Sequence, residues 1–227
     1  MNKTTLNLAA ISIFLMTFSI LLGPFIDLSP AVPAVATFAI LGIATFDSWS
    51  LEGRGGTLFL DLIGGFSKEH RERILHHEAG HFLVAHALGV PVTGYTLSAW
   101  EAFKEKQKGL AGVTFDDVEV LSQFEKGAIT ARILERYYTI WMAGIAAETL
   151  VYENASGGAD DKNKLMGVLK SLGCSESVCN QKKRFSILQA KTLLENNWSA
   201  YQALVDTMRE RATVKECKEI LIEEGVN

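Results

Sequence analysis

The chain has 227 residues, of which 48% are hydrophobic, and it carries a formal net charge of −4. This length is enough for one or two domains with a buried core. The negative charge and the absence of a basic run exclude the usual electrostatic footprint of a nucleic-acid-binding protein. We therefore expect no nucleic-acid partner.

The beginning of the chain is almost free of charged residues. None occurs from Thr4 to Ile26, and only Asp27 interrupts the uncharged run that ends at Phe46. A helix that crosses a bilayer needs about 20 apolar residues. The pattern predicts a membrane anchor over residues 1–50, a transmembrane helical hairpin with helices at about 5–26 and 29–47. The alternatives are a single span followed by an interfacial or re-entrant segment, and a cleaved signal peptide.

Basic residues flank the predicted hairpin: Lys3 precedes it and Arg54 is the first to follow it, whereas the connecting turn has none. Because basic loops stay on the cytoplasmic side, we expect both termini and the soluble part in the cytoplasm or in the stroma of an organelle. The three cysteines are then expected to be free thiols. Residues 51–66 are predicted to be a linker and the start of the soluble part, and residues 67–227 one domain.

The first helix of this domain is expected to run from a cap at Ser67 to about Gly89, and it contains the motif H-E-x-x-H at residues 77–81. Two histidines four residues apart lie on one face of a helix and can bind one metal ion. The glutamate after the first histidine then faces a water molecule and can act as a general base. The motif predicts Zn2+ held by His77 and His81, with Glu78 as the catalytic residue.

The rest of the domain is expected to be mostly helical. Short strands are predicted at residues 92–97 and 110–115, and helices at about 127–152, 159–172, 182–196, 198–211 and 214–223. The helix at 127–152 contains small residues at 143–144 and 146–147, which permit close approach by another helix. The predicted fold class is mainly α with a small β-sheet, preceded by the N-terminal transmembrane helical hairpin.

A catalytic zinc ion usually has three protein ligands and one water molecule, so a third ligand is needed. The other histidines near the motif point elsewhere around the helix or lie too far along its axis (His70, His76 and His86). The third ligand should therefore be a carboxylate from another helix. The candidates are Glu148, Asp160 and Asp161.

Three segments of the domain resemble the FtsH family of membrane-bound zinc proteases. Residues 74–89 resemble the motif helix of that family, residues 142–148 are similar to its small-residue helix ending in Ala-Ala-Glu, and residues 157–161 to its glycine-rich turn before a ligating aspartate. The resemblance covers about residues 70–225 and implies a helical zinc-protease domain. It implies Asp161 as the third metal ligand beside His77 and His81. Asp160 stands in the place of a neutral polar residue, and Glu148 is expected to pack or to support a ligand.

The FtsH family joins an ATPase module to its protease, and no G-x-x-x-x-G-K-[ST] string occurs in these 227 residues. We therefore expect a membrane-anchored, ATP-independent zinc endopeptidase that hydrolyses unfolded or membrane-associated proteins. An extended substrate could add to the strand at 92–97 or to the one at 110–115. The bilayer is the expected partner of the anchor, and a homo-oligomer or association with an ATPase partner is compatible with the resemblance, as is a photosynthetic membrane.

Two other functions compete with this expectation. A proteolytically silent membrane scaffold, or a chaperone-like partner of FtsH-type complexes, would use the same fold without the chemistry, but it would not need Glu78. An intramembrane zinc protease would carry its motif inside a hydrophobic span. The charged residues directly before the motif, Arg71 to Arg73, disfavour that second alternative.

Overall fold

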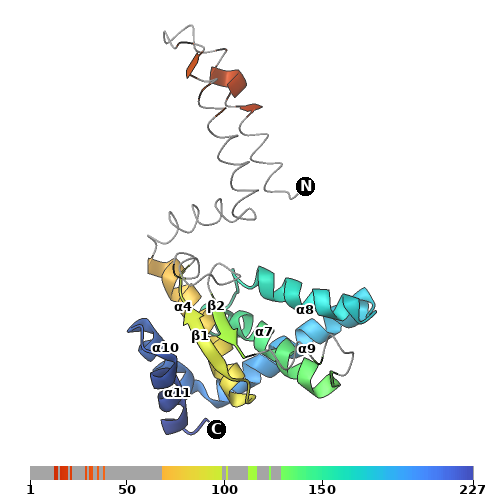
Figure 1. The fold of residues 1–227 in the computed structure, drawn as a ribbon, viewed down its shortest axis with the longest axis vertical. Coiled ribbons are helices and arrows are strands. Elements are labelled where there is room, and N and C mark those ends of the chain that lie inside the picture. Colours follow the sequence, from red (N-terminus) through yellow and green to blue (C-terminus); the bar gives the residue numbers. More distant parts are fainter. Residues whose placement is uncertain are drawn as a thin grey trace. The chain divides into compact units, whose positions relative to one another are not determined.

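The computed structural model describes residues 68–98, 101, 112–116, 123 and 129–226, and near the N-terminus residues 13, 14, 16–19, 21, 29, 31, 32, 35 and 38. The chain divides into two compact units, Met1–Leu60 and Asp61–Asn227 (Figure 1). The described part of the second unit is mainly helical and contains a two-stranded sheet. This confirms the predicted mainly α class with a small β-sheet.

Most of the predicted membrane hairpin, and all of the linker at 51–66, lie outside the described residues. Within the part of the chain that the structure describes, no helix combines the length and the apolar content that crossing a membrane requires. The residues described between positions 13 and 38 include several large hydrophobic side chains that are exposed: Ile13, Phe14, Met16, Phe18, Leu21, Val32, Val35 and Phe38.

The second unit begins, in its described part, with helix α4 (Lys68–Ala87), which contains the H-E-x-x-H motif. The helix ends as predicted, because Gly89 adopts a left-handed φ of 69° that a helix does not continue. The predicted cap Ser67 lies outside the described residues. Strands β1 (Val92–Thr96) and β2 (Gly112–Phe115) follow and pair antiparallel, close to the predicted positions.

Five helices complete the described domain: α7 (Ala131–Tyr152), α8 (Ala159–Ser171), α9 (Glu176–Asn196), α10 (Trp198–Arg209) and α11 (Val214–Glu223). Two of them begin at a capping residue that the prediction missed. The Thr130 side chain accepts the Ile133 N–H, so α7 starts later than the predicted residue 127. The Ser175 side chain caps α9, which starts earlier than the predicted residue 182.

Helices α4 and α7 cross at close range, and this crossing positions the motif (Figure 1). A Cβ atom built on Gly80 would lie 2.7 Å from the Ala147 Cβ and 2.8 Å from the Ala143 carbonyl oxygen. No side chain larger than hydrogen fits there, which confirms the expected role of the small residues in α7. Further apolar side chains of α9, α10 and α11 complete the main core. The three cysteines are free thiols, as expected.

Candidate metal centre

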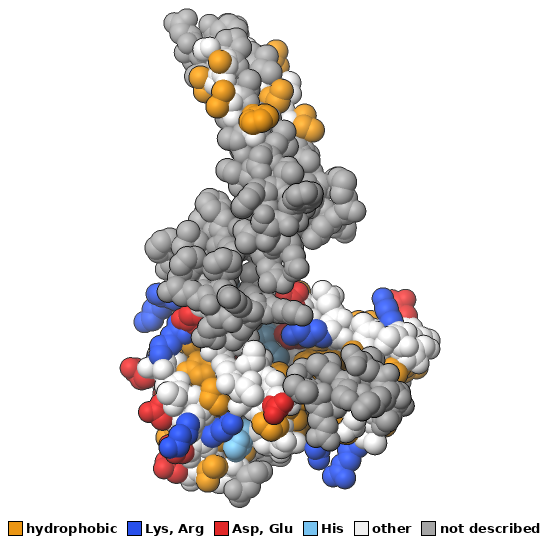
Figure 2. All heavy atoms as spheres, in the orientation of Figure 1, with side chains coloured by type: hydrophobic (Ala, Val, Ile, Leu, Met, Phe, Trp, Pro, Cys, Tyr) orange, Lys and Arg blue, Asp and Glu red, His pale blue; other side chains and the backbone are white. Residues whose placement is uncertain are grey.

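The two histidines of the motif lie on the face of α4 that turns towards α7 and α8. His77 and His81 are buried, with 8% and 6% of their surface exposed, and their ring centroids are 4.8 Å apart. One helical turn separates them, as the motif spacing requires. Figure 2 shows pale blue histidine atoms set back behind neighbouring coloured side chains on one face of the molecule.

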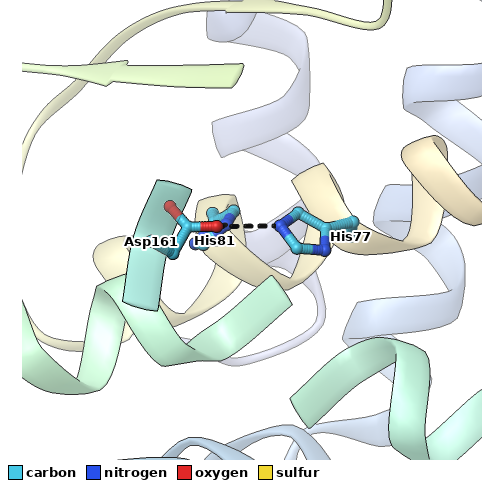
Figure 3. Close-up of side chains that lie close together, drawn as sticks. All are labelled: His77, His81 and Asp161. Carbon is cyan, nitrogen blue, oxygen red and sulfur yellow. Dashed lines mark hydrogen bonds and ion pairs between the residues drawn. The ribbon is translucent and has the colours of Figure 1, made fainter. Parts of the chain in front are cut away.

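A carboxylate from a distant part of the sequence meets the two rings. Asp161 lies in the first turn of α8, and its Oδ2 is 3.2 Å from His77 Nε2 and 3.5 Å from His81 Nε2 (Figure 3). One ligand atom from each of these three residues lies within 4.8 Å of the other two, an arrangement that could hold a metal ion. The neighbouring Asp160 is exposed and is not part of this group.

The far side of each imidazole is fixed by a hydrogen bond. His81 Nδ1 lies 2.7 Å from the Ile140 carbonyl oxygen, which can only accept, so this nitrogen carries the proton. His77 Nδ1 lies 2.7 Å from Glu148 Oε1. In both rings Nε2 is then the atom turned towards Asp161, and such outer partners fix the tautomer and orientation of metal-binding histidines.

Glu148 therefore supports a ligand and does not join the three converging atoms. Its carboxylate accepts the backbone N–H of Ser156 at 2.9 Å and that of Gly157 at 3.2 Å, besides its contact with His77. These bonds tie the connection between α7 and α8 to the end of α7. The supporting role that the sequence favoured for Glu148 agrees with this geometry.

The charges of the cluster stabilise one another. Burial by itself would lower the pKa of His77, but hydrogen bonds with Asp161 and Glu148 outweigh it and raise this pKa to about 10. Burial also opposes the charged forms of both carboxylates. The His81 and His77 imidazoles nonetheless hold the pKa of Asp161 far below its usual range, and the bond with His77 lowers that of Glu148. The cluster thus favours a positive charge beside its two carboxylates.

Glycines leave the space that the His77 ring fills. A Cβ atom on Gly144 of α7 would overlap the His77 ring, and one on Gly157 would lie 2.6 Å from Glu148 Oε1. Gly158, which precedes α8, adopts a left-handed φ of 78° that a side chain would strain. The geometry of the site therefore requires glycine at positions 144, 157 and 158.

Glu78 follows His77 and is buried, with no hydrogen-bond partner for its Oε2 among the described residues. Burial raises the pKa of its carboxyl. Strand β2 passes close to this oxygen, because a Cβ atom built on Gly112 would lie 4.0 Å from Glu78 Oε2. A buried carboxylate oxygen without a partner is a free acceptor for the proton of a small molecule at the site.

The structure also places two of the other histidines. His76 Nδ1 lies 2.8 Å from the Tyr201 hydroxyl, and His86 Nε2 lies 3.1 Å from the Val226 carbonyl oxygen. Both hydrogen bonds lie away from the candidate metal centre, as the direction of these two histidines around the helix predicted. Sequence reasoning missed Arg73, which contacts Glu148 and the connection that precedes α8. Its position one helical turn before His77 shows which face of α4 it shares, but the sequence gives no sign of its partners in the distant connection.

No protein-family model matches the chain, and no curated protein matches it either. The structure itself therefore characterises the protein. It has a mainly helical domain in which two histidines and an aspartate form a candidate metal centre beside a buried glutamate.

Proposed function

We propose that the protein is a membrane-anchored zinc endopeptidase similar to the FtsH family, which hydrolyses unfolded or membrane-associated proteins. The observation that carries this proposal is the convergence of His77 Nε2, His81 Nε2 and Asp161 Oδ2 beside the Glu78 carboxylate. The resemblance of three sequence segments to that family supports the same reading.

The donor set supports zinc as the ion. Two imidazoles and one carboxylate are the kind of protein ligands that leave a catalytic zinc one open position. With bonds of about 2.0–2.1 Å, the edge of a tetrahedron around zinc is about 3.3 Å long. The distances from Asp161 Oδ2 to the two Nε2 atoms, 3.2 and 3.5 Å, are close to this value.

The chemistry divides between the ion and the chain. Bound zinc supplies Lewis acidity, which makes water more acidic and polarises a carbonyl group. Glu78 takes a proton from the attacking water and gives it to the nitrogen of the leaving amine. The water oxygen bonds to the carbonyl carbon while the C–N bond breaks, so that one peptide and one water become an acid and an amine.

We assign substrate binding to β2. Strand β2 lies beside Glu78 through Gly112, and β1 pairs with one edge of β2. Within the described residues no strand pairs with the second edge of β2. An extended peptide that adds to this edge gains main-chain hydrogen bonds, which favours unfolded segments over folded ones.

The membrane location is part of the proposal. It is supported by the uncharged N-terminal sequence and by the exposed hydrophobic side chains described there, such as Phe14, Leu21 and Phe38. The absence of a phosphate-binding loop from these 227 residues supports cleavage that needs no ATP. Protein released from membranes by alkaline carbonate without detergent would contradict the anchor.

The direct test uses the full chain, purified in detergent, with zinc content and casein cleavage as readouts. The wild type should bind one zinc ion and cleave casein equally with and without ATP. Glu78→Gln should keep the zinc and lose cleavage by roughly 100- to 10,000-fold, because it removes the base and not a ligand. Glu219→Gln, half exposed on α11, is the matched control and should change neither quantity.

Two outcomes overturn the proposal. Cleavage by Glu78→Gln at the wild-type rate would show that Glu78 is not the general base. A wild type that binds zinc and cleaves no unfolded substrate would favour the proteolytically silent scaffold instead.

A further inference from the structure

Arg73 links helix α4 to the connection between α7 and α8. Its guanidinium Nη1 lies 3.2 Å from Asn154 Oδ1 and 3.2 Å from Ser156 Oγ. The same group lies 4.3 Å above the centre of the Tyr152 ring. The two hydrogen bonds bridge more than 80 positions of sequence, so they fix the fold of this connection and not merely a local turn.

The connection that Arg73 holds leads directly to a metal ligand. Helix α7 ends at Tyr152, Glu153 turns the chain with a left-handed φ of 64°, and Gly158 starts α8 with another. Asp161 follows in the first turn of α8. A displacement of residues 153–158 therefore moves the aspartate away from the two histidines.

Arg73 also faces the carboxylate that orients His77. Its Nη1 is 3.7 Å from Glu148 Oε2, and the Glu148 side chain is 2% exposed. A buried carboxylate is costly unless charged or hydrogen-bonding partners surround it. Arg73 thus acts on two ligands at once, on His77 through Glu148 and on Asp161 through the connection.

We propose that Arg73 is a positioning residue of the metal centre. It contacts no ligand atom among the three converging groups, and it holds both the Glu148 carboxylate and residues 153–158 in place. This inference rests on the metal centre of the proposed function. The guanidinium is suited to the task because Nη1 donates to both Asn154 and Ser156 while the face of the planar fork lies over the Tyr152 ring, a stacking contact that a lysine ammonium does not reproduce.

The expected effect is a loss of metal affinity. Loss of outer partners of metal ligands typically weakens metal binding by about 10- to 100-fold. Arg73→Met should fall in this range. Arg73→Lys keeps the positive charge near Glu148 but loses the fork, so its zinc dissociation constant should lie between those of wild type and Arg73→Met.

The test is a zinc titration of the full chain in detergent, stripped of metal, against a competing chromophoric chelator. Asn154→Ala removes one partner of Arg73, and the double variant Arg73→Met, Asn154→Ala should lose less than the product of the two single effects, because both changes remove the same hydrogen bond. The matched control is Arg209→Met. Arg209 forms an ion pair with Glu72, the residue before Arg73 on α4, but contacts none of residues 153–158 in the described structure.

A spectroscopic readout separates positioning from general stability. With Co2+ in place of zinc, the visible absorption of the bound ion reports the ligand geometry. Arg73→Met should change this spectrum, while Arg209→Met should leave it as in the wild type. Arg73→Lys and Asn154→Ala test the same point if Arg73→Met does not fold.

The outcomes distinguish this inference from the proposed function. A wild type that binds no zinc overturns the metal centre itself. A wild type that binds zinc and cleaves casein, together with Arg73→Met and Asn154→Ala variants of unchanged zinc affinity and Co2+ spectrum, overturns the role of Arg73 alone.

Discussion

Two regions of the domain share one hydrophobic core but differ in the polar side chains that they bury beside it. The region formed by α4, α7 and the start of α8 buries ionisable side chains: His77, Glu78, His81 and Glu148. In α10 and α11, as described, the buried residues are apolar or aromatic, such as Leu204, Met208 and Leu221. Buried polar groups reduce stability unless they have partners, whereas buried apolar groups add to it. The first region therefore gives up some stability at the candidate metal centre, and the second adds to stability.

The largest expected effect separates stability from binding. Leu204→Ala removes a fully buried side chain of α10 and should reduce the free energy of unfolding by about 2–5 kcal/mol. Because Leu204 lies in the apolar region, the zinc affinity of the folded protein should not change. Thermal unfolding and a zinc titration below the transition measure the two quantities. A weakened zinc affinity in this variant would show that the two regions are coupled.

The second prediction concerns the binding region. Gly144→Ala places a methyl group where the His77 ring lies, so zinc affinity should fall on the order of 100-fold, equivalent to roughly 2.7 kcal/mol. Gly167→Ala is the matched control, because a Cβ atom on this α8 glycine meets nothing within 4 Å. The control should keep its zinc affinity and gain up to about 1 kcal/mol of stability. Equal affinity in both variants would contradict the described position of His77.

The smallest predicted effect lies in the apolar region. Thr213 and Glu216 form a capping box at the start of α11, and Thr213→Ala should destabilise the protein by about 1 kcal/mol at neutral pH. Hydrogen bonds from Thr213 lower the pKa of Glu216 from its ordinary value of 4.5. Its stabilising contribution is therefore present above that value and declines as the pH falls below it. The difference in melting temperature between wild type and Thr213→Ala should accordingly shrink in acid; a constant difference would mean that the carboxylate is not involved.

Local sequence patterns predicted most helices of the domain, because their determinants are local. The motif spacing predicted helix α4, and Gly89 predicted its end. The small residues of α7 predicted its close crossing with α4. The errors came from capping residues: Thr130 delays α7 and Ser175 advances α9, and a single hydroxyl decides each boundary. Most of the predicted membrane hairpin lies outside the described residues.

The candidate site was less accessible to local patterns. His77 and His81 followed from their spacing, but the residues alone left Glu148, Asp160 and Asp161 open as third ligand, and the resemblance to the FtsH family selected Asp161. Which of the two adjacent aspartates points towards the histidines depends on the direction in which α8 starts after the left-handed Gly158. The contact of Arg73 with Asn154 depends on the tertiary fold, and no sequence pattern predicted it.

The close crossing of α4 and α7 has a further consequence for ion selectivity. Gly80 leaves no room between the two backbones, and Gly144 fixes the distance of the His77 ring from α7. Calcium requires six to eight oxygen ligands at about 2.3–2.6 Å, and this site offers two nitrogens and one carboxylate. In the proposed zinc centre, these ligand types would therefore favour zinc over calcium, and the close packing of α4 and α7 would oppose a rearrangement that brings in further ligands.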